Sequence, residues 1–114
     1  MNNNEQIKRW IEHIFKFDFQ GKKILKNQIL NSKISYHQYY DYISIEFSVD
    51  EGIEIYPYKS RVPVEVIAYQ KSSVPVLFLL HVVNGKISEL EILKADSSEI
   101  NPNNIELDNL KLLI

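Results

Sequence analysis

The stretch that decides the fold runs from Val74 to Ala95 and reads VPVLFLLHVVNGKISELEILKA. Two apolar segments flank the dipeptide Asn84-Gly85 within it. This dipeptide is typical of a two-residue β-hairpin turn, because both turn positions require a positive φ that Asn and Gly tolerate. The sequence therefore predicts one β-hairpin that is closed at these two residues.

The turn also predicts the register of the hairpin, provided that the ladder is unbroken. Continuous pairing from the turn places His81 opposite Ser88 and puts four apolar residues on one face: Leu77, Leu79, Leu90 and Ile92. We expect that face to belong to the core. The opposite face would then expose Phe78 and Leu80 beside the carboxylates of Glu89 and Glu91.

Helical periodicity marks the N-terminal part of the chain, about residues 4–31. The first expected helix follows Glu5 and carries apolar residues at helical spacing: Ile7, Trp10, Ile11, Ile14 and Phe15. The second is expected from Lys22 to Asn31, with a buried stripe of Ile24, Leu25, Ile29 and Leu30. Both helices are amphipathic and need a partner surface.

An alternation of period two replaces the helical pattern in the sheet region, about residues 40–95. The inner face of this sheet is predicted to hold, besides the hairpin residues, Ile43, Ile45, Phe47, Val62, Val64 and Val66. The C-terminal segment 103–114 fits either a strand or a short helix. The predicted fold is a single α+β domain over residues 1–114, with two N-terminal helices packed on one face of a four- to five-stranded antiparallel meander.

The composition of the chain excludes several functional classes. Its 114 residues include no cysteine, which excludes disulfides, thiolate metal sites and a cysteine nucleophile. The formal net charge of -2 disfavours nucleic acid as a partner, because that binding depends on neutralising phosphates. The N-terminus lacks the apolar region of a signal peptide and no apolar run is long enough for a membrane span, so we expect a cytoplasmic protein without a membrane partner.

Motifs that would indicate catalysis or cofactor binding do not occur in the sequence. GxSxG, HExxH, the P-loop and GxGxxG are all missing. The three histidines, His13, His37 and His81, fall on different predicted elements and have no paired ligand spacing. We therefore expect a non-enzymatic protein with no metal and no cofactor.

The outer face of the predicted sheet combines acidic groups with apolar and aromatic ones. Its candidate residues for partner binding are Tyr42, Glu46, Glu65, Ile67, Tyr69, Phe78, Leu80, Glu89 and Glu91. Apolar groups that are contiguous on a surface are typical of a binding site. Glutamates at alternate positions also keep a solvent-facing strand hydrated, so the carboxylates alone do not indicate catalysis.

A tyrosine cluster precedes the first regular strand pattern, at Tyr36, Tyr39, Tyr40 and Tyr42, around His37 and Asp41. A tyrosine offers a rigid apolar body with a polar tip, which suits a recognition surface. The same residues also fit packing under the sheet edge or against the helices. Tyr39 and Tyr40 join Tyr42 as candidates for partner binding.

His81 interrupts the apolar run LLHVV and has two interpretations. It is either a general base with a hydroxyl partner or a histidine held by a local hydrogen bond at the sheet rim. The first interpretation describes a small ligand-binding or hydrolase-like domain. Its pocket would lie between the helices and the sheet near His81, with Tyr40 and a glutamate as further polar groups.

The segment from Val62 to Ile100 resembles a family of small uncharacterised bacterial α+β proteins that share a hairpin of the LLHVVNGKISELEI type. The similarity is most specific at Asn84-Gly85, at Leu90-Glu91-Ile92 and at Asp96. Members often carry a cysteine-rich segment before the first sheet strand. This chain has Tyr36 to Tyr42 there, so the resemblance implies no thiol or metal role and no assigned activity.

These observations favour a non-enzymatic protein-interaction module. Small acidic α+β proteins often serve as immunity partners of bacterial toxins, and a toxin is one partner of this kind. A second copy of the chain is another. In either case we expect the acidic and aromatic sheet face to make the contact, and the pocket near His81 is the alternative.

Overall fold

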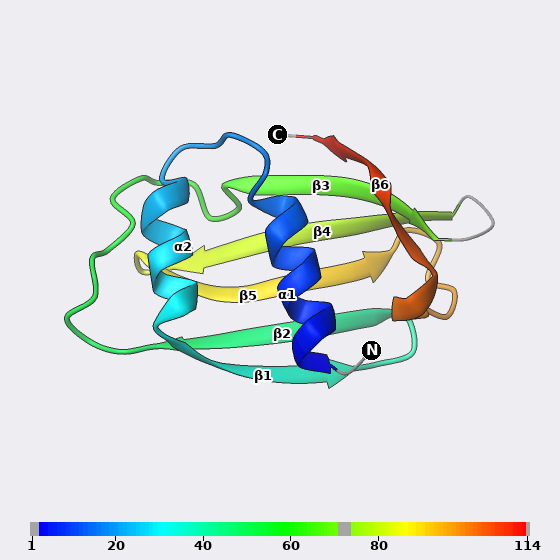
Figure 1. Ribbon diagram of the computed structural model, residues 1–114, viewed down its shortest axis with the longest axis horizontal. Helices are drawn as coiled ribbons and strands as arrows, with labels where there is room; N and C mark the ends of the chain where they lie inside the picture. The colour runs from blue at the N-terminus through cyan, green and yellow to red at the C-terminus, as the bar shows by residue number, and fades with distance from the viewer. Residues whose placement is uncertain (1–2, 71–73, 114) are drawn as a thin grey trace.

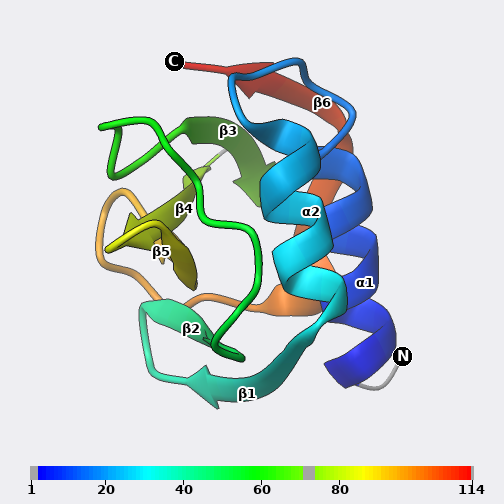
Figure 2. The same ribbon diagram turned by 90° about the vertical axis from the view of Figure 1, so that its left-hand side faces the viewer.

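The computed structural model describes residues 3–70 and 74–113. It contains two helices on one side of a six-stranded antiparallel sheet (Figures 1 and 2). The helices are α1 (Asn3–Ile14) and α2 (Lys22–Leu30). The strands are β1 (Ser32–Gln38), β2 (Tyr42–Val49), β3 (Val64–Gln70), β4 (Val74–Val83), β5 (Lys86–Lys94) and β6 (Ile105–Leu112), the last preceded by the 3-10 turn η1 (Pro102–Asn104). The α+β class is confirmed, with more strands than we expected.

The strand order is β1-β2-β5-β4-β3-β6, which corrects the predicted meander. β3, β4 and β5 do follow one another as neighbours, but β2 pairs with β5 and not with β3. The long connection 50–63 makes this order possible, because it passes the β4–β5 turn before β3 begins (Figure 1). Along it, the Tyr56 N–H donates to the Gly85 carbonyl at 2.8 Å.

Two strands were not resolved by the sequence pattern. β1 pairs with β2 through a turn at residues 39–41, which lacks the Gly or Pro that would have marked a turn in the sequence. The C-terminal segment, which fitted strand or helix equally, forms β6 and pairs with the outer side of β3. Residues 71–73 of the expected sheet and residue 114 of the expected C-terminal segment lie outside the described residues.

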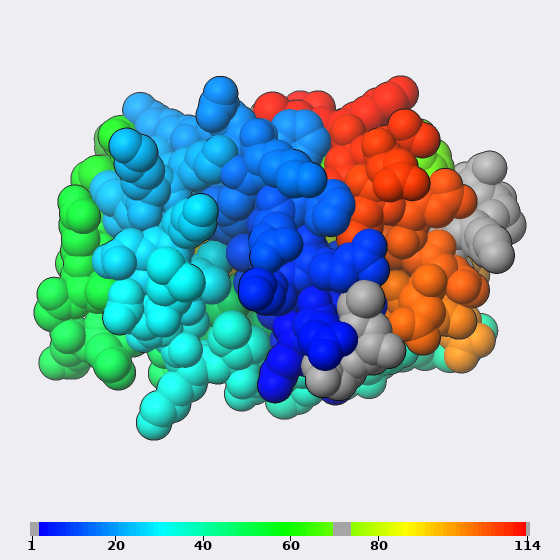
Figure 3. Space-filling view, in the orientation of Figure 1, coloured from blue at the N-terminus to red at the C-terminus, as the bar shows by residue number. Residues whose placement is uncertain are grey.

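The helices cover the sheet as their periodicity predicts (Figure 3). Ile7, Trp10 and Ile14 of α1 are buried, and the Trp10 ring meets the Phe78 ring edge-on at 6.1 Å between centroids. The expected stripe of α2 is partly wrong. Leu25 and Ile29 are buried, but Leu30 is 75% exposed, because it ends the helix where the chain turns into the edge strand β1.

A fully buried glutamine fixes α2 to the hairpin turn. The Gln28 Nε2 donates to the carbonyls of Glu54 and Gly85, at 2.9 Å each, and its Oε1 accepts from the Ile87 N–H at 2.7 Å. Both N–H donors of the amide and one of the two lone pairs of its oxygen are therefore used. This side chain joins the helix layer, the long connection 50–63 and the β4–β5 turn.

The hairpin turn is confirmed, but the register beyond it is not. Asn84 and Gly85 have φ of 52° and 77°, and Val83 faces Lys86 as expected. A β-bulge then leaves Ser88 unpaired, because Val82 faces Ile87 whereas His81 faces Glu89. Every pair beyond this point is shifted by one residue from the predicted ladder.

This shift exchanges the two faces of β4. Phe78 and Leu80, which we expected on the outer face, are 2% and 1% exposed in the core. Leu77 and Leu79, which we expected in the core, lie half-buried on the opposite face. The other predicted inner residues are buried, apart from half-buried Val62: Ile43, Ile45, Phe47, Val64, Val66, Leu90 and Ile92.

Neither helix in the described ranges is long and apolar enough to cross a membrane. The charged residues of both helices lie on the side away from the sheet, which agrees with their amphipathic patterns.

Candidate functional site: the open face of the sheet

The sheet has one face that neither helix covers (Figure 2). We call it the open face. It is formed by alternate residues of the four inner strands, namely Tyr42, Ser44, Glu46, Glu65, Ile67, Tyr69, Leu77, Leu79, His81, Glu89, Glu91 and Leu93. Their partners at intervening positions fill the core beneath the helices, because successive side chains of a strand point to opposite faces.

Apolar side chains form a continuous row across the open face. Tyr42 faces Leu93, Leu93 faces Leu77, and Leu77 faces Ile67, so one row crosses β2, β5, β4 and β3. Residues directly opposite one another on neighbouring strands are in side-chain contact distance. Leu79 extends this apolar row along β4, and all these side chains remain half-buried.

Carboxylates gather beside the apolar row, in two further rows. One row places Glu91 and Glu65 on either side of Leu79, and the next places Glu46 and Glu89 opposite each other. We expected acidic and apolar groups to alternate across the face. The register separates them, because Leu93 lies opposite Tyr42 on β2 and, beyond the bulge at Ser88, opposite Leu77 on β4.

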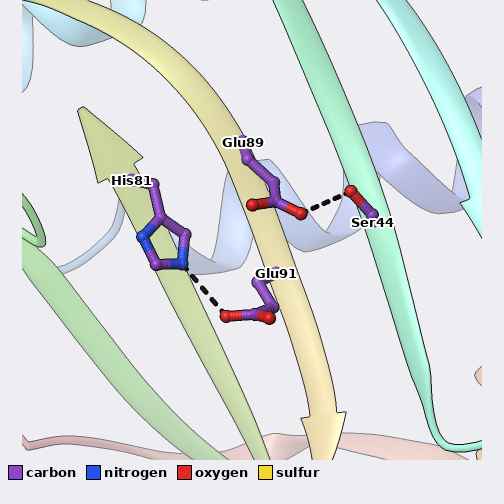
Figure 4. Close-up of polar contacts among 4 residues, drawn as sticks. All are labelled: Ser44, His81, Glu89 and Glu91. Atoms are coloured by element: carbon purple, nitrogen blue, oxygen red, sulfur yellow. Dashed lines mark hydrogen bonds and ion pairs between the residues drawn. The ribbon is translucent and has the colours of Figure 1, made fainter. Parts of the chain in front are cut away.

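Diagonal hydrogen bonds tie two of the carboxylates, Glu89 and Glu91, to neighbouring strands (Figure 4), and a third carboxylate has an ion-pair contact. The Glu91 Oε1 lies 3.1 Å from the His81 Nε2, and the Ser44 hydroxyl donates to the Glu89 carboxylate. At the edge of the face, the His37 Nε2 lies 3.9 Å from the Glu46 Oε1. These contacts orient the carboxylates, and those of Glu89 and Glu91 belong to half-buried residues.

The same contacts do not form a serine–histidine pair. A serine nucleophile needs a base that takes its hydroxyl proton. Here Ser44 bonds to Glu89 and His81 bonds to Glu91, so each group has a different partner, and β5 lies between the strands that carry them (Figure 4). The arrangement orders a surface and does not form a hydroxyl–imidazole pair.

The tyrosine cluster divides between the two faces. Tyr39 stacks on Tyr42 with ring centroids 4.4 Å apart and planes 16° apart, which extends the apolar row to the β1–β2 turn. Tyr40 is 68% exposed in that turn. Tyr36 points to the helix side and packs against the core.

Loss of hydration raises the pKa of the Tyr42 phenol above its usual value of 10.0. The neighbouring Tyr39, Asp41, Glu89 and Glu91 raise this pKa further, because an extra negative charge is unfavourable near them. Tyr42 therefore presents a neutral hydroxyl at the junction of the apolar row and the carboxylates.

A depression of about 450 Å³ lies at this junction. The residues that line it include Asp41, Tyr42, Glu89, Glu91 and Leu93. Lys94 also borders it, but its Nζ donates to the Glu99 carbonyl at 3.1 Å and the residue is 5% exposed. The depression is thus acidic, and it suits a cationic group of a binding partner.

No group of three or more His, Asp or Glu side chains is placed to hold a metal ion in the ranges 3–70 and 74–113. The acidic rows of the open face are spread along strands and do not converge on one point. Their chemistry is that of a charged surface.

The structure brings most of the sequence-predicted candidates together. Tyr39, Tyr42, Glu46, Glu65, Ile67, Tyr69, Glu89 and Glu91 lie on or beside the open face, and Tyr40 lies in the adjacent turn. Phe78 and Leu80 do not, for the reason given above. The sequence analysis missed Leu77, Leu79 and Leu93. Knowledge of the bulge at Ser88 would have placed Leu77 and Leu79 outside, whereas alternation with Glu89 and Glu91 along the strand already places Leu93 there.

The location of His81 corrects the alternative interpretation. His81 lies on the open face, and its neighbour Leu80 is the residue that faces the helices. A pocket between the helices and the sheet therefore does not include the imidazole, and the exposed Tyr40 in the β1–β2 turn is likewise on no such pocket wall. His81 instead forms a local hydrogen bond with Glu91, which is the kind of contact that the second interpretation of this residue predicted.

The fold and the site define an α+β protein with an uncovered, partly acidic sheet face. No family model matches the sequence, and no curated protein or solved structure matches it either. Its function is therefore argued from the open face itself.

Proposed function

We propose that this protein is a non-enzymatic interaction module that binds a protein partner through the open face. The observation that supports this most is the apolar row of Tyr42, Leu93, Leu77 and Ile67, which crosses four strands without a helix above it. Uncovered apolar groups that are contiguous and bordered by polar groups are typical of protein-binding surfaces.

The proposed partner carries an apolar patch with basic residues beside it. Glu46, Glu65, Glu89 and Glu91 border the apolar row, and Asp41 adds a further carboxylate at the depression. Complementary charge accelerates association and disfavours partners of the same charge. A bacterial toxin neutralised by an immunity-type protein is one partner of this description, since small acidic α+β proteins often serve as such immunity partners.

Charge reversal on the open face tests this proposal. The variant combines Glu65→Lys, Glu89→Lys and Glu91→Lys, and the matched control combines Asp50→Lys, Glu51→Lys and Glu54→Lys. The control residues are exposed and lie outside the open face, and the change in net charge is the same. Each tagged protein is expressed in the native host, cross-linked and purified, and co-purifying proteins are quantified by mass spectrometry.

We expect the wild type and the control to retain the same partner and the open-face variant to lose about tenfold or more of it. Raised salt should weaken the wild-type complex, because solvent-exposed charges are screened. Equal partner recovery with the open-face variant would contradict the proposal. Circular dichroism of all three proteins separates loss of binding from loss of folding.

A further inference from the structure

We infer that β1 is a self-association edge, through which two copies of this chain pair to form one continuous antiparallel sheet. β1 is the first strand of the sheet and has β2 as its only strand neighbour in the described part of the chain. Figures 1 and 2 show it along the border of the sheet. This inference uses a different surface from the open face and does not depend on the function proposed for that face.

The hydrogen-bonding groups of β1 alternate between β2 and the free edge. The Tyr39 N–H donates to the Tyr42 carbonyl at 2.9 Å, which marks a hydrogen-bonded pair of the β1–β2 ladder. Such pairs alternate along an antiparallel ladder, and the β1–β2 register has no shift. The N–H and C=O groups of Ile34 and Tyr36 therefore point away from β2, into the free edge.

The two edge strands of the sheet differ in how well they are protected against pairing with another chain. β6, at the other edge, has an irregular register with β3 and carries three charged residues, Glu106, Asp108 and Lys111. Bulges and charges are the devices that prevent edge strands from pairing with another chain. β1, SKISYHQ, has a regular ladder and one charged residue, Lys33, so its edge lacks this protection.

The sequence of β1 is self-complementary in antiparallel pairing. A two-fold axis at Ser35 pairs all seven residues of the strand with those of the second copy. This register places Ile34 opposite Tyr36 of the second copy, in a hydrogen-bonded pair. It places the small Ser35 side chains opposite each other at the axis, where the two backbones approach most closely. The near-neutral strand can meet a second copy with little charge repulsion, unlike the acidic open face.

The helix side of the same edge carries apolar surface for the second copy to cover. Ile34 is 43% exposed and Leu30 is 75% exposed. Both line a groove of about 520 Å³ that runs between α1, α2 and β1 and includes Ile7, Ile11 and Ile29. A paired strand places Tyr36 of the second copy beside Ile34, on the side of the sheet where this groove opens.

A cysteine at the proposed axis tests the pairing directly. The chain has no cysteine, so Ser35→Cys introduces the only thiol. Opposed residues of a non-hydrogen-bonded pair lie about 4.5 Å apart at Cα, which a disulfide can bridge. We expect Ser35→Cys to form a disulfide-linked dimer on mild oxidation. The control Ser48→Cys, also exposed but on β2, should stay monomeric on a non-reducing gel.

Sedimentation equilibrium provides the second measurement. Ile34→Glu places a charge opposite Tyr36 of the second copy and should weaken dimerisation by about tenfold or more. Leu112→Glu is its matched control on β6, since Leu112 is 41% exposed, and it should leave the dimer unchanged. Thermal unfolding checks that both variants fold.

Two results would overturn the inference. One is a wild-type chain that stays monomeric up to about 1 mM, with no cross-link in Ser35→Cys. The other is a dimer that Ser35→Cys does not capture and Ile34→Glu does not dissociate, because that dimer would use another surface. Loss of partner binding in the open-face variants would leave both measurements unaffected, so the two proposals fail separately.

Discussion

Single residues decide how the layers of this protein meet. Gln28 is the clearest example, because one buried amide satisfies two carbonyls and one N–H from segments that are far apart in the sequence. The sequence pattern predicted α2 from its apolar residues and assigned no role to this polar one. Periodicity identifies buried apolar positions, whereas a buried amide is recognised only from its hydrogen-bond partners.

Gly85 provides a prediction at this scale. Its φ is +77°, and a Cβ at this position would overlap the Ile55 Cγ2. Gly85→Ala should therefore lower the free energy of unfolding by about 2 kcal/mol, through backbone strain and the displaced isoleucine. Urea unfolding followed by circular dichroism measures this change.

Gly52→Ala separates the two causes of that loss. Gly52 also has a positive φ, of +86°, but a Cβ there would meet nothing within 4 Å. Its substitution should cost only the backbone strain, about 1 kcal/mol. Equal losses in the two variants would show that the contact with Ile55 does not contribute.

Asp96 gives a pH-dependent prediction. The Ser98 hydroxyl and N–H both donate to its Oδ1, at 2.6 Å and 3.0 Å, and these bonds hold the pKa of Asp96 below its ordinary value of 3.8. A carboxyl with a lowered folded pKa stabilises the fold above its unfolded pKa, and this contribution is lost as the pH falls through the folded pKa.

Carboxyl NMR titration measures this pKa. Ser98→Ala removes the hydroxyl donor, so the Asp96 pKa should rise toward 3.8 while the Ser98 N–H keeps part of the shift. In this variant, Asp96 should therefore contribute less to the free energy of unfolding as the pH falls into the acid range. An Asp96 pKa that is unchanged in this variant would contradict the assigned cause.

At the scale of elements, a single unpaired residue sets which side of the hairpin is buried. The turn at Asn84-Gly85 was predictable, because few other dipeptides accept two positive φ values. The bulge at Ser88 was not predictable. β4 is apolar on both faces, so its pattern fits either register, and in the structure the face that carries Phe78 packs against Trp10.

Deleting Ser88 tests the role of the bulge. Without this residue the ladder from Ile87 to Glu89 becomes regular, and all pairs beyond it keep their partners and faces. We expect the deleted protein to fold with a free energy of unfolding within about 2 kcal/mol of the wild type. Amide NMR should show Leu80 and Leu90 still buried.

Deleting Glu91 is the matched control in the same strand. This deletion moves the buried Ile92 and Lys94 to the open face and turns Leu93 inward. Cooperative unfolding should be lost. If both deletions behaved alike, the bulge would not be what sets the two faces.

At the scale of the whole molecule, the predicted fold was correct in class and in the side covered by helices, but not in strand order. The sequence treated successive strands as neighbours, which is the commonest arrangement. The connection 50–63 instead carries the chain past the hairpin turn, where Tyr56 is buried and bonds to Gly85. The local sequence pattern of that connection does not predict which strands it places beside each other.

The candidate site was predicted in its acidic half and missed in its apolar half. Glu46, Glu65, Glu89 and Glu91 lie on the open face as expected. The apolar row that supports a binding function exists only because four strands align Tyr42, Leu93, Leu77 and Ile67. Alignment across strands depends on register and order, which the sequence alone did not supply.

The two proposed surfaces together have a geometric consequence. Pairing at β1 would join two open faces into one surface with two equal binding sites. Two sites on one particle bind a repeated or dimeric partner more tightly than either site alone, if the spacing of the partner matches. The monomer presents each surface once, so this gain depends on the edge strand and not on any new contact.

The contact between α1 and the sheet also provides a fluorescence probe of the fold. The chain contains one tryptophan, Trp10, and that indole is fully buried and packs edge-to-face with the Phe78 ring. Its emission therefore originates from a single place, the junction of the first helix with β4. Dry apolar surroundings shift indole emission to short wavelength, and separation of α1 from the sheet would move it toward the red. Intrinsic fluorescence thus reports when the helix layer leaves the sheet, whereas circular dichroism reports the loss of the strands and helices themselves.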